Sequence, residues 1–148
     1  MAPPPASSTN CVMCELPAFQ RGSDDHRRIA DLEVSTAILA SREQFYLGYT
    51  LLVLNQHVEE LFDLDQALRQ QFVEDANRIA EALNKTFSPL KINYCLLGNT
   101  LRHLHWHLIP RRQTDPTPKR PVWEDPIPHV QLSENEFRQL AHDIRANL

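Results

Sequence analysis

The stretch His-Leu-His-Trp-His-Leu-Ile, residues 103–109, places a histidine at every second position. Successive side chains of a β-strand point to opposite faces of the sheet, so His103, His105 and His107 share one face and the apolar residues share the other. A single histidine on such a face is more often a packing residue. Three at this spacing indicate a chemical site on one face of the strand and a hydrophobic core on the other.

Apolar runs on either side of this stretch predict further strands. Residues 34–40 and 49–54 are short, apolar and rich in β-branched residues, which predicts a hairpin. Residues 92–97 form a similar run, separated from 103–109 by a turn that contains Gly98. Four strands grouped in this way favour an α+β domain with a mainly antiparallel sheet.

Two helices complete the expected domain. Between residues 63 and 87 the apolar residues recur every three or four positions, which is typical of an amphipathic helix. Ser133 and Glu136 have the spacing of a capping box at the start of a second helix, residues 133–146. The side chains expected to pack the long helix against the sheet are Leu68, Phe72, Ile79 and Leu83.

Length and composition limit the remaining possibilities. A chain of 148 residues has the size of one domain, expected here at residues 11–148, after a disordered tail at 1–10 that is rich in proline and serine. Five prolines between residues 113 and 128 predict an extended surface arm. The 15 Lys and Arg against 19 Asp and Glu give no general reason to bind nucleic acid or anionic membranes. With no signal peptide and no long apolar run, a cytoplasmic protein is expected.

The three cysteines are an odd number in a chain with no export signal, which argues against a disulfide framework. Cys11 and Cys14 have the spacing of half a tetrahedral zinc site, but no second pair of cysteines follows them. The alternative is a reduced thiol pair that packs as small apolar side chains, which is also the interpretation of Cys95.

Residues 103–109 are similar to the signature of the histidine triad (HIT) family, in which three histidines alternate with apolar residues. Pro110-Arg111 after the signature also resembles that family, and the likeness extends over residues 34–112. The chain resembles bacterial members close to the fragile histidine triad and dinucleoside polyphosphate hydrolase branch. The resemblance implies the HIT-like fold, with a mainly antiparallel sheet of about five strands, a long central helix and a C-terminal helix. It also implies a homodimer.

The activity implied by the resemblance is hydrolysis or transfer of a nucleotidyl group in two steps. His105, the middle histidine, would attack the α-phosphorus and hold the nucleotidyl group until water removes it. His103 would orient the site, and His107 would act beside the leaving group as a hydrogen-bond donor or proton relay. The substrate would be a nucleotide, with a dinucleoside polyphosphate as the first expectation, and catalysis would require no cofactor.

Two further positions are assigned to substrate binding on the same resemblance. Asn99 falls where related proteins place an amide against the α-phosphate, although a turn alone would also explain an asparagine there. Ser41 stands where many members carry Asn or Asp to hold the ribose, so the nucleoside preference is open. Arg111 and Arg112 are interpreted as the solvated end of the strand rather than as phosphate ligands.

The resemblance also completes the zinc site. It implies that His57 and His103 join Cys11 and Cys14 in holding a structural zinc ion, which would fix the orientation of His103.

Two other functions are compatible with the residues alone. The three histidines could hold a catalytic zinc ion for direct attack by water. Alternatively, the chain could bind nucleotides without turnover, because Ser41 and a short loop between Leu97 and His103 depart from the familiar enzymes.

Overall fold

The computed structural model describes residues 10–148 and contains a five-stranded antiparallel sheet covered by helices. The strand order is β1-β2-β3-β5-β4. The expected tail at residues 1–10 lies outside the described residues, apart from Asn10. The strands are β1 (Arg28–Asp31), β2 (Ser35–Leu39), β3 (Thr50–Leu54), β4 (Lys91–Cys95) and β5 (His105–Arg111). The α+β fold expected from the sequence is therefore confirmed.

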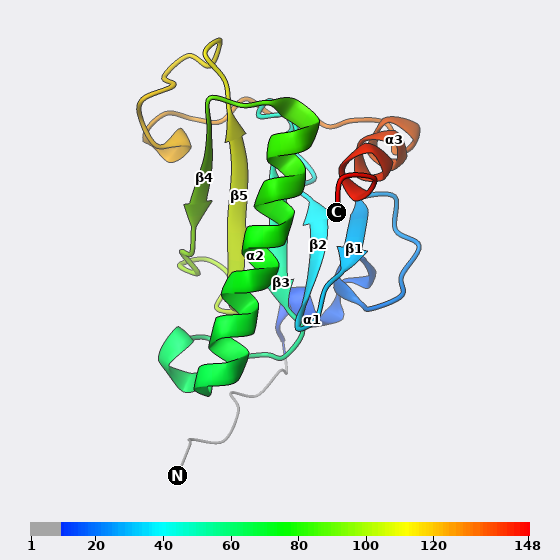
Figure 1. Cartoon of the computed structure of the whole chain (residues 1–148), viewed down its shortest axis with the longest axis vertical. Helices are drawn as coiled ribbons and strands as arrows, with labels where there is room; N and C mark the ends of the chain where they lie inside the picture. Colours follow the sequence, from blue (N-terminus) through cyan, green and yellow to red (C-terminus); the bar gives the residue numbers. More distant parts are fainter. Residues whose placement is uncertain (1–9) are drawn as a thin grey trace.

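The long helix α2 (Gln66–Phe87) crosses one face of the sheet (Figure 1). Asp65 caps its start by accepting a hydrogen bond from the backbone N–H of Leu68, and Ser88 ends it in the left-handed conformation. The predicted packing face is confirmed: Phe72, Ile79 and Leu83 are fully buried, and Leu68 is partly buried against them.

At the β1 end of the sheet lies α3 (Glu134–Arg145), which carries the capping box expected at Ser133 and Glu136. The hairpin of β2 and β3 and the pairing of β4 with β5 are also confirmed. The sequence analysis missed β1, because only Ile29 and Ala30 separate its two charged ends and a run this short has no readable alternation. None of the helices in residues 10–148 is both long and apolar enough to span a membrane.

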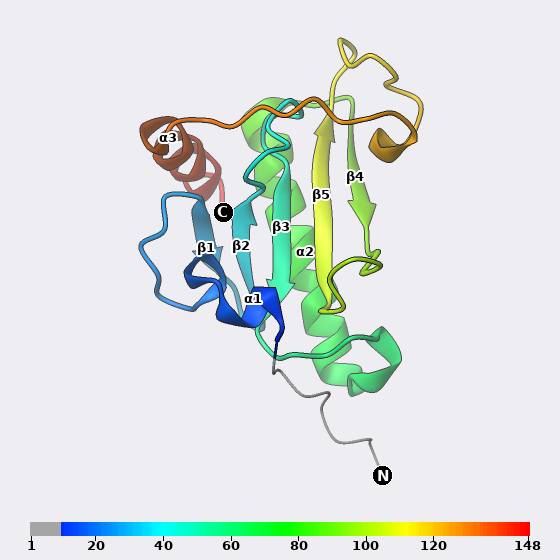
Figure 2. The ribbon, with the colours of Figure 1, turned by 180° about the vertical axis from the view of Figure 1, so that it is seen from behind.

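The segment that follows β5 covers part of the face opposite α2 before it runs back to α3 (Figure 2). The expected surface arm at 113–128 needs correction, because it contains a short 3-10 helix, Val122–Glu124, and contributes to a second core. Val122 is buried there with Tyr46, Tyr49 and Ile109. Proline excludes regular structure from the arm but does not stop apolar residues between the prolines from packing.

The interpretation of Arg111 as a solvated strand end is wrong. The residue is only 1% exposed, and its guanidinium forms an ion pair of 2.9 Å with Asp115. It also donates hydrogen bonds to the carbonyl oxygens of Thr117 and Arg120. Burial of this charge is possible because the arm folds back and supplies the acceptors. Arg112 is half-buried and donates to the carbonyl oxygen of Leu47.

Replacement of Leu83 by alanine should lower the free energy of unfolding by about 2–5 kcal/mol, because it leaves a cavity between α2 and the sheet. Leu90→Ala is the matched control, since Leu90 is 57% exposed and its loss should cost less than about 1 kcal/mol. Urea denaturation of both variants measures the difference. Equal destabilisation by the two substitutions would contradict the assigned core.

Candidate active site

Strand β5 begins at His105, so His103 lies in the turn before the strand rather than within it. Leu104 and Leu108 are buried in the main core beneath α2, and Trp106 packs against that core. The rings of His105 and His107 point to the other face, where their centroids are 4.8 Å apart. The alternation expected from the sequence thus separates core from histidines along β5.

His105 is held in a single tautomer by a main-chain group. Its Nδ1 lies 2.6 Å from the carbonyl oxygen of His103. A carbonyl oxygen can only accept, so Nδ1 carries the hydrogen and Nε2 of the neutral ring keeps its lone pair. Burial lowers the pKa of His105, partly opposed by this hydrogen bond, and the ring is therefore neutral at pH 7. A neutral imidazole with a free Nε2 is a nucleophile.

His107 is enclosed by two aromatic residues that the sequence analysis did not single out. The hydroxyl of Tyr49 lies 2.8 Å from its Nδ1, and the rings of His107 and Trp123 form a T-shaped pair with a centroid distance of 5.2 Å. Burial, with a smaller effect of His105, lowers the pKa of His107 to about 4. Burial also raises the pKa of Tyr49, so its hydroxyl stays protonated and can donate to Nδ1. His107 then presents Nε2–H.

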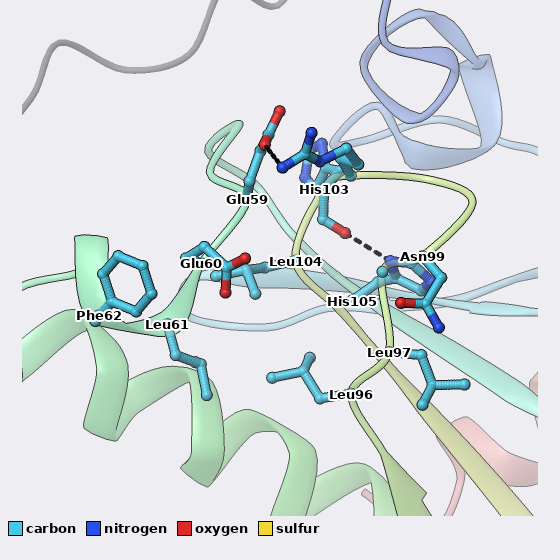
Figure 3. A pocket seen from close by; sticks show the side chains of 12 residues that line it. Glu59, Glu60, Leu61, Phe62, Leu96, Leu97, Asn99, His103, Leu104 and His105 are labelled. Carbon is cyan, nitrogen blue, oxygen red and sulfur yellow. Dashed lines mark hydrogen bonds and ion pairs between the residues drawn. The ribbon is translucent and has the colours of Figure 1, made fainter.

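A cavity of about 570 Å³ opens beside His105, between the loop that follows β4 and the segment before α2 (Figure 3). Asn99 from the loop and His105 both line it. Arg102 and Glu59 form an ion pair of 3.1 Å at the same cavity. Ser41 does not line this cavity; it follows β2, half-buried, toward the other end of the sheet.

The four residues expected to hold zinc come together at the end of the sheet where β5 begins. Cys11 precedes the short helix α1 (Val12–Glu15) and Cys14 lies within it, next to His57 and His103. Their ligand atoms all lie within 4.8 Å of one another. The Nε2 of His103 is 2.7 Å from the carbonyl oxygen of Leu54, so Nε2 carries the hydrogen and the Nδ1 lone pair faces the cluster.

The distances within this cluster fit tetrahedral zinc. With Zn–S near 2.3 Å and Zn–N near 2.0–2.1 Å, sulfur and nitrogen ligands lie about 3.5 Å apart and two nitrogens about 3.3 Å apart. The Sγ atoms of Cys11 and Cys14 are each 3.5 Å from Nδ1 of His103, and Cys14 Sγ is 3.5 Å from Nδ1 of His57. The two Nδ1 atoms are 3.2 Å apart. The donor set therefore suits a structural zinc ion.

Residues 22–114 match the family model described as HIT domain. The chain belongs to the HIT domain family. The Bacillus subtilis protein named Protein hit is 27% identical over 112 residues, which cover 69% of this chain and 71% of that protein. A crystal structure of a HIT protein from Sinorhizobium meliloti has a TM-score of 0.75 and 29% identity, covering 88% of this chain and 97% of that one.

Two more distant structures share the HIT fold. A Zn-bound histidine triad family protein from Mycobacterium smegmatis has a TM-score of 0.68 at 24% identity, covering 95% of this chain and 94% of that one. The Plasmodium falciparum diadenosine triphosphate hydrolase has a TM-score of 0.65 at 17% identity, covering 86% of this chain and 80% of that one. At these identities the likeness establishes the common architecture of the HIT domain.

Of the two aromatic residues around His107 in this HIT domain, only Tyr49 could have been placed there from the sequence. Leu51 pairs with His107 in the sheet, so Tyr49, two positions earlier, falls on the histidine face. Trp123 has no such signal, because it reaches His107 through the return of the arm after β5.

His107 should remain neutral down to about pH 4, whereas an unperturbed histidine titrates near 6.5. The unfolded chain takes up this proton at the higher pH, so acidification between about pH 6.5 and 4 should favour unfolding. A side-chain NMR titration of His107, assigned with a His107→Asn variant, measures the pKa. Titration of His107 near pH 6.5 would contradict the buried, neutral ring.

Proposed function

We propose that residues 11–148 act as one HIT domain that hydrolyses or transfers nucleotidyl groups, with His105 as the nucleophile. The observation that carries the proposal is the bond from Nδ1 of His105 to the carbonyl oxygen of His103. It leaves Nε2 unprotonated on a buried, neutral ring at a cavity lined by Asn99. The bond cleaved would be a phosphoanhydride or a phosphoramidate.

In the first step, the lone pair on Nε2 of His105 forms a bond to the α-phosphorus. The bond from that phosphorus to the leaving oxygen or nitrogen breaks, and the leaving group keeps the electron pair and takes up a proton. The positive charge that develops on the imidazole is stabilised by the Nδ1–H bond to the carbonyl oxygen of His103. Water then forms a bond to the phosphorus while the bond from phosphorus to Nε2 breaks, and the electron pair of that bond returns to His105. The proton that the water releases balances the one taken up by the leaving group.

His107 and Asn99 would assist both steps. His107 would donate Nε2–H to the phosphate or the leaving group, with Tyr49 holding its other nitrogen. The amide of Asn99 would donate to an oxygen of the α-phosphate. Ser41 lies outside the cavity beside His105, so we do not assign the ribose contact to it. A dinucleoside polyphosphate is the substrate we favour, which the fold shared with a diadenosine triphosphate hydrolase supports. No metal is needed at the reacting atoms in this scheme.

We also propose that two copies join as a homodimer through the edge of the sheet. Among residues 10–148, strand β4 pairs with β5 alone, so its outer edge is open in this part of the single chain. Tyr94 on this strand is 46% exposed. An open edge with an exposed aromatic residue supports pairing with a second copy.

The cluster of Cys11, Cys14, His57 and His103 would hold one structural zinc ion. When bound, zinc would supply a fixed point for the ring of His103, whose carbonyl oxygen orients His105. The Zn-bound relative from Mycobacterium smegmatis supports the presence of a metal in this fold. The rival function as a zinc hydrolase has less support, because Nδ1 of His103 faces Cys11 and Cys14 and its Nε2 donates to the carbonyl oxygen of Leu54, so His103 has no nitrogen left to share a metal with His105 and His107.

Substitution of His105 by asparagine should lower kcat on a cleaved nucleotide by about ten-thousandfold or more, because the nucleophile is lost. A panel of dinucleoside polyphosphates and nucleoside phosphoramidates identifies that substrate. Mass spectrometry of rapidly quenched reactions should find a nucleotidyl adduct on the unmodified protein only. His142→Asn, on an exposed site in α3, is the matched control.

Near-native turnover by His105→Asn would disprove covalent catalysis through this residue. Tight nucleotide binding with no turnover of any substrate would instead favour a binding module.

Protein purified without chelator should contain one zinc ion per chain. Cys11→Ser should lose the metal and lower the thermal stability, because only three of the four ligands would remain. Cys95→Ser is the matched control, since Cys95 lies in β4 outside the cluster. Elemental analysis and thermal unfolding measure both effects. The zinc site would be excluded by substoichiometric metal in the unmodified protein.

A further inference from the structure

A second cavity of about 560 Å³ lies on the histidine face, between β4 and residues 118–123 of the arm. Besides Tyr94, the residues of β4 that line it are Lys91, Asn93 and Cys95. These three pair in register with Arg111, Ile109 and His107 of β5, so their side chains belong to the histidine face of the sheet.

Two residues that line this cavity are neighbours of His107. Trp123 lines it and meets the ring of His107 at a centroid distance of 5.2 Å. Cys95 also lines it and lies opposite His107 in the sheet. The cavity beside His105 and this second cavity therefore lie on either side of the pair of histidines that would carry the reaction.

The charged residues that line the second cavity are all basic, although the chain has a net charge of −4. Four basic residues line the cavity and no carboxylate does: Lys91, Arg111, Lys119 and Arg120. Arg111 is neutralised by Asp115, and Arg120 is paired with Glu124. Within residues 10–148, neither lysine forms an ion pair with a carboxylate.

The wall of the cavity is fixed in place by Arg111. Its guanidinium donates to the side chain of Asn93 on β4 and to the carbonyl oxygens of Thr117 and Arg120 on the arm. A buried guanidinium that loses these acceptors would carry a large desolvation penalty, so the arm is held against the sheet. The cavity is thus built before any ligand binds.

We propose that this second cavity binds the phosphates of the leaving group, through the charges of Lys91 and Lys119. The inference rests on the proposed function, because it places the α-phosphate at His105 and the rest of the substrate beyond His107. The leaving group gains negative charge as its bond to the α-phosphorus breaks, and nearby cations stabilise that charge. The substrate class that follows has two or more phosphates beyond the cleaved bond.

Binding of inorganic tripolyphosphate tests the cavity without reference to turnover. Isothermal titration calorimetry with the full chain should show binding that the double variant Lys91→Gln/Lys119→Gln weakens by about tenfold or more, since two charged contacts are lost. Lys85→Gln, an exposed lysine of α2 already paired with Glu81, is the matched control and should not change the affinity. Absence of binding, or equal affinity for the unmodified protein and the double variant, would overturn the proposal.

Kinetics then separate this proposal from the function on which it rests. The ratio of kcat/KM for a dinucleoside polyphosphate to kcat/KM for a nucleoside phosphoramidate, whose leaving group carries no phosphate, should fall about tenfold in the double variant. A ratio equal to that of the unmodified protein would overturn the cavity assignment and leave His105 catalysis intact. Full activity of His105→Asn would overturn the proposed function while the tripolyphosphate result stands.

Discussion

The hydrogen bond from Nδ1 of His105 to the carbonyl oxygen of His103 is the constraint on which the site depends. It selects the tautomer with a free Nε2, and it would stabilise the imidazole as a bond to phosphorus forms. The acceptor must itself be held still. The ring of His103 provides this, because Nε2 donates to Leu54 on β3 and Nδ1 lies against the sulfur atoms of Cys11 and Cys14. The cysteine-histidine cluster is thus linked to His105 through a main-chain oxygen.

Strand β5, which carries His105 and His107, also contributes to the hydrophobic core of the domain. Leu104 and Leu108 are buried beneath α2, and the histidines between them project from the opposite face. A shift of β5 by one residue would move every side chain to the wrong face, so the packing under α2 fixes the register of the histidines as well. The alternation of apolar residues and histidines along β5 therefore sets both the core packing and the positions of the histidine rings.

Features that arise from local sequence patterns could be predicted from the sequence. Features that depend on how the arm at residues 113–128 folds back onto the sheet could not. The long helix follows from a spacing of three to four residues and the separation of histidines from core follows from a spacing of two. The four longer strands follow from short apolar runs, several of them rich in β-branched residues. Strand β1 is too short to show such a spacing. The cysteine pair is a local signal for half of a metal site, but His57 and His103 were assigned only through the family resemblance. The positions of Arg111 and Trp123 depend on how the arm folds back.

The arm at residues 113–128 is held in place by the buried charge of Arg111 rather than by regular secondary structure. Its prolines remove backbone donors and exclude helix or central strand. Arg111 supplies donors in their place, and a planar guanidinium can satisfy several carbonyl oxygens at once. Because these bonds are made away from water, loss of any one leaves a buried polar group unpaired. The arm therefore holds Trp123 against His107 through Arg111, and the orientation of His107 depends on an arginine at the far end of β5.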